Sequence, residues 1–423
     1  MTLTLTPFDT ASILIVLAAV FGYVNFRFLH LPQSVGLTAM GAVASLLIVA
    51  VDQMLPQSHI GDNVVQFLDG LDFQSTLLDG MLSFLLFAGA LHVNWSEMRR
   101  GRWPVLILST VGVVLSTLVI GGGLALALGL VGLSLPVAWC LVFGALISPT
   151  DPVAVIAALG RTSVPPTLQA TVAGESLFND GVGVVIFSIV LATALGGESF
   201  SLPHAVQLFF TEAGGGVLLG LAIGWIGYRA MHSIDDYKME VLISLAIVMG
   251  GYSLARWLGV SGPVAMAVAG LLIGNHGVAH AMSDITQDYL LKFWSLIDDI
   301  LNAVLFLLIG LEVVAIPAET PALLLAAIAI PLVLAARAIS VLLPLAILRP
   351  ILSLGPLAPT TLIWGGLRGG ISVALALGLP SGGERSIVLT ATYAVVLFAV
   401  IVQGGTIERV LTWQSSRAAA KPL

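Results

Sequence analysis

The sequence has little charge. Asp, Glu, Lys and Arg make up 9% of its 423 residues, against the roughly 25% of a soluble domain. Hydrophobic residues make up 58%, so the chain needs lipid as its solvent. Its apolar runs leave no room for a second, soluble domain. We therefore expect one membrane domain over residues 1–410 and a short tail at 411–423.

Other residues are also scarce. The single cysteine, Cys140, excludes an internal disulfide. None of the three lysines lies in a Gly-x-x-x-x-Gly-Lys-Ser/Thr loop, which excludes a nucleotide-driven pump of that type. The sequence contains no basic patch for nucleic acid. We expect neither nucleotide nor nucleic acid as a partner, no enzymatic activity and no cofactor.

What the sequence does contain is apolar runs of about 20 residues, the length of helix that crosses a hydrocarbon layer of roughly 30 Å. We count about thirteen, which predicts an all-α polytopic membrane protein. They run approximately over residues 11–29, 34–52, 77–93, 104–132, 136–158, 168–196, 205–229, 240–258, 262–276, 300–317, 321–348, 357–379 and 386–410.

The loop charges predict the orientation, because cytoplasmic loops are enriched in Lys and Arg. Every second loop is basic, through Arg27, Arg99, Arg100, Arg102, Arg161, Arg229, Lys238, Lys292, Arg349, Arg409, Arg417 and Lys421. The opposite loops are mainly acidic, with Asp62, Asp69, Asp72, Glu198, Glu319 and Glu384 beside Arg256 and Arg385. The amino end is expected outside a bacterial-type inner (cytoplasmic) membrane and the carboxyl end in the cytoplasm. Residues 278–299 mix apolar and charged side chains, and we expect an amphipathic linker helix on the cytoplasmic surface.

Two segments are predicted to break in mid-membrane. The fifth reads Ser148-Pro149-Thr150-Asp151-Pro152, whose prolines remove helix hydrogen bonds. The twelfth reads Trp364-Gly365-Gly366-Leu-Arg368-Gly369-Gly370, whose glycines favour unwinding but are also typical of close helix packing. Broken segments in corresponding halves indicate a central ion site, at which Thr150 and Asp151 supply oxygen ligands.

The sixth segment reads Gly174-Glu175-Ser176-Leu-Phe-Asn179-Asp180-Gly181, and helical spacing places Ser176 and Asp180 on one face. Hydroxyl and carboxylate oxygens suit a hard monovalent cation. Desolvation disfavours an ionised carboxylate, so a proton and a cation can compete for Asp180. Charged residues in membrane segments are costly and indicate function, although buried acids and bases also pair simply to hold helices together. The candidates are Asp151, Glu175, Asp180, Arg337 and Arg368.

At these motifs, together with Arg337-Ala-Ile-Ser340, the chain resembles the monovalent cation:proton antiporter 1 family, the NhaP-type sodium/proton exchangers. The resemblance spans nearly all the membrane chain. It implies thirteen helices in two inverted repeats, crossed discontinuous helices in segments 5 and 12, and a homodimer. It also implies core helices at about 104–196 and 321–410 and dimerisation helices at about 11–52 and 205–276.

The resemblance implies a role for each motif residue. Sodium is bound by Thr150, Asp151, Ser176 and Asp180, with Asn179 supporting the site. Glu175 and Arg337 form a structural ion bridge. We expect Arg368 to compensate charge at the broken helices. Many members have a Glu in the third segment, where this chain has Ala88, so that ligand is not transferred.

The sequence therefore predicts sodium/proton exchange for sodium and pH homeostasis. The alternatives are a potassium or mixed monovalent cation/proton antiporter, a cation channel, and a cation sensor that transports nothing. Three buried acids, Asp151, Glu175 and Asp180, against Arg337 and Arg368 leave one negative charge in the empty core. One sodium ion or one proton neutralises it, which predicts electroneutral exchange.

Overall fold

A computed structural model describes residues 6–54, 64, 67, 80–130, 132, 135–162, 164–196, 201–277, 282–315, 320–348 and 354–419. Within these ranges the regular structure consists of helices and one isolated β-bridge. Several charges used in the orientation argument lie outside the described residues, namely Asp62, Asp69, Asp72, Glu198, Glu319, Arg349 and Lys421.

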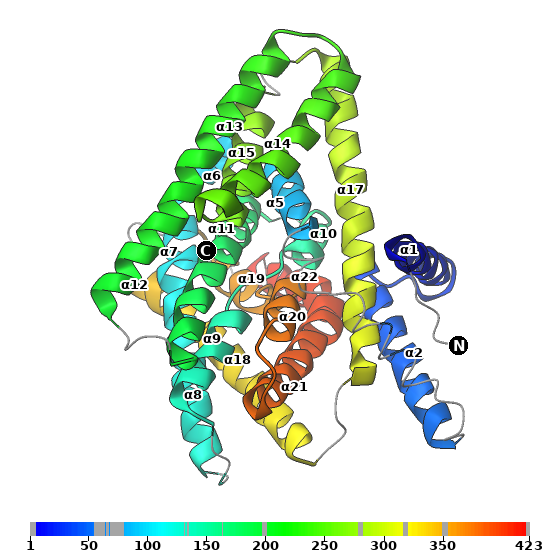
Figure 1. Ribbon diagram of the computed structural model, residues 1–423, viewed down its shortest axis with the longest axis vertical. Coiled ribbons are helices and arrows are strands. Elements are labelled where there is room, and N and C mark those ends of the chain that lie inside the picture. Colours follow the sequence, from blue (N-terminus) through cyan, green and yellow to red (C-terminus); the bar gives the residue numbers. More distant parts are fainter. Residues whose placement is uncertain are drawn as a thin grey trace.

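The first part of the chain forms seven of the membrane segments, whose helices are labelled in Figure 1. Short π-helical turns interrupt some of them. The elements are α1 (Pro7–Val24), η1 (Asn25–Leu29), α2 (Gln33–Met54), α5 (Leu82–Leu91), α6 (Trp95–Arg100), α7 (Arg102–Ser109), α8 (Val111–Leu130), α9 (Val137–Ile147), α10 (Val153–Leu159), α11 (Pro166–Ala194), α12 (Leu202–Phe209), η3 (Phe210–Gly214) and α13 (Gly215–His232).

The remainder forms six more segments, which brings the described total to the predicted thirteen. Its elements are α14 (Tyr237–Leu258), α15 (Gly262–Leu272), η4 (Ile273–Gly277), α17 (Asp284–Leu311), η5 (Glu312–Ala315), α18 (Thr320–Ile347), α19 (Ala358–Trp364), α20 (Gly370–Leu377), α21 (Gly383–Phe398), η6 (Ala399–Gly404) and α22 (Gly405–Ala419).

Length and hydropathy support a multi-pass membrane protein. Eight helices in the described part are long and apolar enough to cross a bilayer. The other five segments are α5 and α15, which are shorter, the broken pairs α9–α10 and α19–α20, and the more charged α17. Successive segments alternate in direction, so segments 5 and 12, which are seven apart, run in opposite directions as inverted repeats require. The predicted fold class is confirmed.

The surface helix predicted at 278–299 is not a separate element, and this prediction was wrong for residues 284–299, whereas 278–281 lie outside the described residues. Residues 284–299 are the first half of α17, which continues without a break to Leu311. Residues 284–309 contain neither Gly nor Pro, so nothing ends the helix where the charges stop. The 28 residues of α17 extend about 42 Å, longer than the hydrocarbon layer. The tail also differs from the expectation, because α22 carries the last segment on to Ala419.

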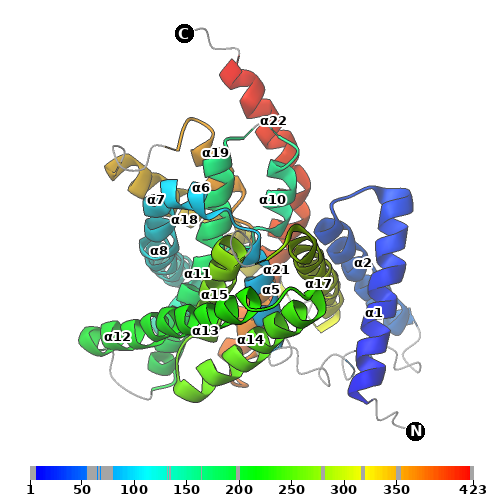
Figure 2. The same ribbon diagram turned by 90° about the horizontal axis from the view of Figure 1, so that it is seen from above.

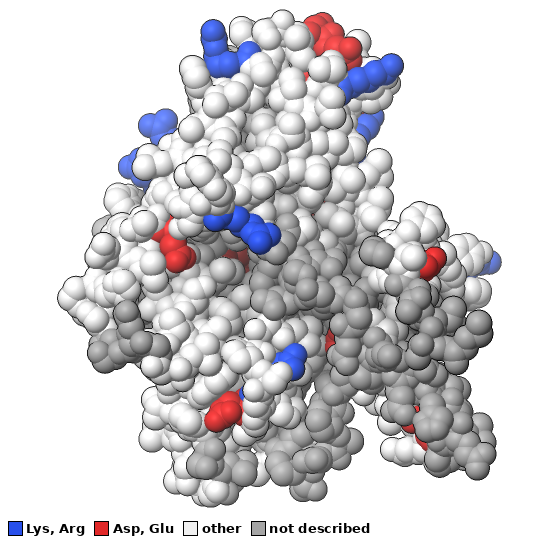
Figure 3. Space-filling model, in the orientation of Figure 1, with Lys and Arg blue, Asp and Glu red and all other residues white. Residues whose placement is uncertain are grey.

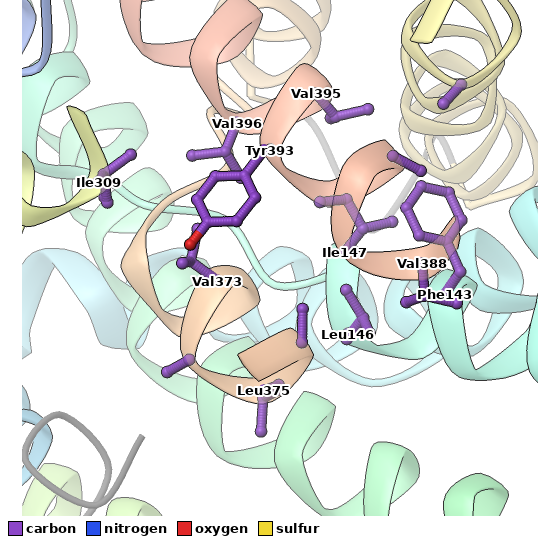
Figure 4. Packing of buried hydrophobic residues seen from close by; sticks show 14 of the residues in the cluster. Phe143, Leu146, Ile147, Ile309, Val373, Leu375, Val388, Tyr393, Val395 and Val396 are labelled. Atoms are coloured by element: carbon purple, nitrogen blue, oxygen red, sulfur yellow. The ribbon is translucent and has the colours of Figure 1, made fainter. Parts of the chain in front are cut away.

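The apolar core is centred on α9, the first half of one broken helix, on α20, the second half of the other, and on their neighbours. Figure 4 shows side chains of α9, α20 and α21 in one cluster, with Ile309 of α17 at its edge. A second cluster joins α5, α14 and α15 to Trp294 of α17. Because α17 contributes to both clusters, it connects the two parts of the bundle. Figure 2 shows α1 and α2 on the outer side of α17, away from the other helices.

Surface charge is concentrated at the ends of the helices. On the face shown in Figure 3, most Lys and Arg atoms lie over the upper half of the molecule, including the region where α13 turns into α14. Arg229 and Lys238 flank that turn. The side walls of the bundle are largely uncharged, as a lipid-facing surface must be.

Small residues allow α2 to pack closely against α17. A Cβ on Gly41 would lie 2.9 Å from the backbone oxygen of Leu307 and 3.1 Å from the Cα of Gly310. Hydroxyl groups also bond across this contact: Thr38 donates to the carbonyl oxygen of Phe306 at 3.0 Å and Ser45 to that of Leu311 at 2.6 Å. Close approach of this kind is how membrane helices associate where lipid gives no hydrophobic advantage.

We predict that Gly310→Val lowers the melting temperature in detergent, because overpacking this contact costs about 1–3 kcal/mol. Gly22→Val is the matched control, since a Cβ on Gly22 meets no heavy atom within 4 Å. Equal melting temperatures for the two variants would contradict the assignment of this contact.

Candidate functional site

The site forms where two broken helices cross. The first helix ends at Ile147 and resumes at Val153, and the second ends at Trp364 and resumes at Gly370. The two extended stretches meet through a hydrogen bond of 2.8 Å from the amide of Asp151 to the carbonyl oxygen of Leu367. Both predicted interruptions are therefore present, and they lie against each other inside the protein.

Arg368 satisfies the backbone carbonyls that the first break releases. Its guanidinium donates through Nη1 to the carbonyl oxygens of Ser148 and, at 3.0 Å, Pro149. The side chain is only 1% exposed. The end of α9 carries partial negative charge, and a cation there is stabilising. Arg368 therefore places a positive charge at the end of α9.

Asp151 begins the second half of the broken helix. Its Oδ1 accepts a hydrogen bond of 2.9 Å from the amide of Val153, the first residue of α10. Glycine is required at position 369 on the opposite stretch, because a Cβ there would overlap the Asp151 side chain. This bond leaves Oδ2 of Asp151 without a hydrogen-bond partner among the described residues.

Helix α11 holds the extended stretch from the side. Ser176 donates to the carbonyl oxygen of Thr150. Asn179 makes two bonds to Thr150, accepting from its amide at 3.3 Å and donating to its Oγ1 at 2.8 Å. Ser176 and Asn179 lie about one helical turn apart on α11, so both contact the same residue, Thr150, of the extended stretch at 148–152, which we call the crossing strand. The bonds from Asn179 therefore fix the position of the Thr150 hydroxyl.

Asp180 lies one turn after Ser176 on the same face of α11 and is 7% exposed. Its carboxylate has no hydrogen-bond donor or basic partner among the described residues. It lines a cavity of about 350 Å³ together with Thr150, Asp151, Ser176 and Ser372. The four side chains predicted to bind sodium thus surround one cavity. One water needs only about 15 Å³, so there is room for a cation with part of its hydration shell.

Glu175 and Arg337 pair behind the cavity and do not line it. Their two hydrogen bonds are 2.5 and 3.0 Å long, and the residues are 2% and 7% exposed. The Nε of Arg337 also donates to the carbonyl oxygen of Leu362 at 3.0 Å. The pair therefore links α11 to α18 and α19, and its geometry is that of a structural bridge.

Sequence reasoning missed one wall of the cavity. Asp298, Asp299 and Asn302 of α17 line it. The two aspartates belong to the segment that was predicted to lie on the cytoplasmic surface, and Asn302 belongs to the predicted membrane segment 300–317. The available signal was helical spacing: Asp298, Asn302 and Leu305 follow at i, i+4 and i+7, and all three line the cavity. Because residues 284–299 carry several charges, they were not predicted to continue the helix of the apolar run at 300–317.

We predict that Glu175→Gln and Arg337→Gln each destabilise the protein by about 3–5 kcal/mol, because each leaves a buried charge unpaired. The double variant costs less than the sum. The control is Asp288→Asn, which breaks the exposed pair with Lys292 and leaves the melting temperature near that of the wild type. Single variants as stable as the wild type would show that the bridge is dispensable.

Comparisons with known proteins agree with this architecture. The sequence profile of the family described as "Sodium/hydrogen exchanger, transmembrane" matches residues 15–413. The chain is 43% identical to the Na⁺/H⁺ antiporter NhaP of Pseudomonas aeruginosa over 400 residues, 94% of each protein. It is 34% identical over 391 residues to the Na⁺/H⁺ antiporter NhaH of Halobacillus dabanensis, covering 90% of this chain and 92% of that protein.

A solved structure has the same fold. The sodium proton antiporter MjNhaP1 of Methanocaldococcus jannaschii superposes with a TM-score of 0.75 at 20% identity, covering 96% of this chain and 97% of that one. The profile match, the curated relatives and the crossed broken helices lead to one conclusion: the chain belongs to the transmembrane sodium/hydrogen exchanger family.

Proposed function

We propose that this protein exchanges sodium for protons by alternating access, and that both bind at Asp180. The observation that carries the proposal is a carboxylate that is nine-tenths buried, has no donor among the described residues and lines a cavity with hydroxyl and carboxylate oxygens. An ionised carboxylate in such surroundings is costly unless a cation or a proton neutralises it. The names of the curated relatives support sodium as the cation.

The mechanism follows from competition. When sodium occupies the cavity, Asp151 and Asp180 supply negative charge, and the hydroxyls of Thr150 and Ser176 supply neutral oxygens. When a proton occupies Asp180, the carboxyl becomes neutral and sodium loses a ligand. Asn179 and Arg368 keep the crossing strand in place in both states through their bonds to Thr150 and to the end of α9. Each ion therefore displaces the other from one site.

Other transport functions are less well supported. Potassium or mixed cation exchange is not favoured, because the named relatives are Na⁺/H⁺ antiporters. A channel needs a continuous filter, whereas this site is one cavity beside two broken helices. A sensor that transports nothing would have no need of paired inverted repeats. We therefore propose a transporter rather than an enzyme, with sodium and protons as its substrates and no cofactor.

The proposal includes a setting in the cell. The alternation of basic loops supports an amino end outside the cytoplasmic membrane and a carboxyl end inside it. The long apolar windows of α1 and of α12–α13 are each only 11% buried, so they supply large surfaces for lipid or for a second copy. We propose a homodimer, with the dimer contact at residues 11–52 and 205–276 and the ion-binding core at 104–196 and 321–410.

We predict that Asp180→Asn abolishes sodium-driven proton movement in proteoliposomes, because an amide neither binds the proton reversibly nor supplies charge to sodium. A thermal-shift assay in detergent provides the folding control. The variant remains folded, but sodium no longer raises its melting temperature as it does for the wild type. Substantial exchange by Asp180→Asn would contradict the site.

The charges of the site also support electroneutral exchange of one sodium for one proton. Glu175 and Arg337 cancel, and Arg368 offsets one of the two carboxylates Asp151 and Asp180. Asp298 and Asp299 do not enter the count, because they lie on α17, outside the proposed ligand set. The empty core carries one net negative charge. One sodium or one proton makes it neutral, so only a loaded site crosses the low-dielectric barrier cheaply.

We predict that membrane voltage leaves the exchange rate almost unchanged. The test follows sodium-driven proton movement in proteoliposomes whose potential is clamped with potassium and valinomycin at zero or at about 100 mV. Each net charge moved would be worth about 2.3 kcal/mol at that potential. A strong voltage dependence, or a sodium gradient that generates a potential by itself, would contradict the stoichiometry.

A further inference from the structure

The walls of the cavity differ sharply in chemistry. Helix α5 contributes only apolar side chains and one glycine, through Leu82, Leu85, Leu86 and Gly89. Helix α11 and the crossing strands supply the proposed ion ligands. Apart from Ser372 of α20, the remaining polar side chains belong to the part of α17 that carries Asp298, Asp299 and Asn302. Two carboxylates outside the proposed ligand set thus share a cavity with Asp180.

Asp298 is the better placed of the two. It is partly buried, whereas Asp299 is exposed. Asn302, which is 8% exposed, lies one turn further along α17 and interacts with the Asp298 side chain. Electrostatic interaction couples Asp298 first to Asp299 and then to Asp151. Asp298 thus lines the same cavity with a burial intermediate between exposed Asp299 and buried Asp180, and it has no basic partner among the described residues.

Other carboxylates of α17 are not in this position. Asp284 is exposed in the first turn of the helix. Asp288 pairs with Lys292 at 2.7 Å, so the charge of Asp288 is offset by that lysine. Neither residue lines the cavity. A role for Asp298 therefore rests on its position in the cavity wall and not on the general acidity of α17.

We propose that Asp298 is an entry carboxylate, which attracts sodium into the cavity and passes it to Asp151 and Asp180. This inference rests on the proposed exchange function and names a residue that determines its apparent sodium affinity. A cleft lined by one sign of charge, with low-dielectric walls, raises the local counter-ion concentration about 10- to 1,000-fold. The apolar wall of α5 makes such focusing effective. Because Asp298 is not a ligand of the bound ion, it leaves the chemistry at Asp180 unchanged.

The test compares the wild type with Asp298→Asn, Asp298→Glu and Asp284→Asn in proteoliposomes, and follows proton movement against sodium concentration at low ionic strength. Asp298→Asn raises the sodium concentration for half-maximal rate by about tenfold, the low end of the focusing effect, and keeps the maximal rate. Asp298→Glu restores the wild-type value, and Asp284→Asn does not change it. Added choline chloride reduces the difference, because salt screens an entry charge.

Three outcomes would overturn the inference: an unchanged half-maximal concentration for Asp298→Asn, a lower maximal rate without such a change, or Asp298→Glu as impaired as Asp298→Asn. Failure of Asp298→Asn to fold would also contradict it, since an entry carboxylate is not needed for folding. A wild type that moves no protons in response to sodium would instead refute the proposed exchange function. The two failures are therefore distinguishable.

Discussion

Two helices break inside an apolar bundle, and this is the main physical constraint on the structure. The breaks are stabilised by Arg368 and by the backbone of the two extended stretches that cross, the crossing strands at 148–152 and 365–369. Lipid offers no partner for a freed carbonyl or amide, so each must be satisfied within the protein. The guanidinium takes the carbonyls of Ser148 and Pro149, and the Asp151 amide bonds to the other strand at Leu367. The rest of the site depends on this crossing, because it positions Thr150 and Asp151 beside α11.

The same constraint explains why the Glu175–Arg337 bridge lies where it does. A buried guanidinium such as Arg368 needs compensating charge nearby, and its electrostatic partners are the two members of this bridge, Glu175 and Arg337. Arg337 holds Glu175 in a bidentate pair, so the bridge as a whole is neutral. The site thus keeps one excess negative charge for an ion to neutralise. Glu175 of the bridge and Asp180 of the proposed ion site lie only five residues apart on α11.

The motifs made much of this predictable from sequence. Two prolines around Thr150 and four glycines around Arg368 located both helix breaks, and one turn of helical spacing placed Ser176 and Asp180 on one face. The third wall was not predictable in the same way. Charges at 284–299 satisfy the pattern of a surface helix, and only tertiary packing of α17 against α5 and α2 turns Asp298 inward. A hydropathy value averages over all the side chains of a segment, whereas only one face of a helix lines a cavity.

The role of the cavity is to make two ions exclude each other, and this claim can be tested without transport. The direct measurement is the number of protons released when sodium binds to the purified protein in weakly buffered detergent solution. It is made at a pH where Asp180 is partly protonated, with Asp180→Asn as the blank. Competition for Asp180 predicts release that approaches about one proton per sodium bound as the pH falls, and none from the variant. Sodium binding by the wild type without proton release would contradict the account.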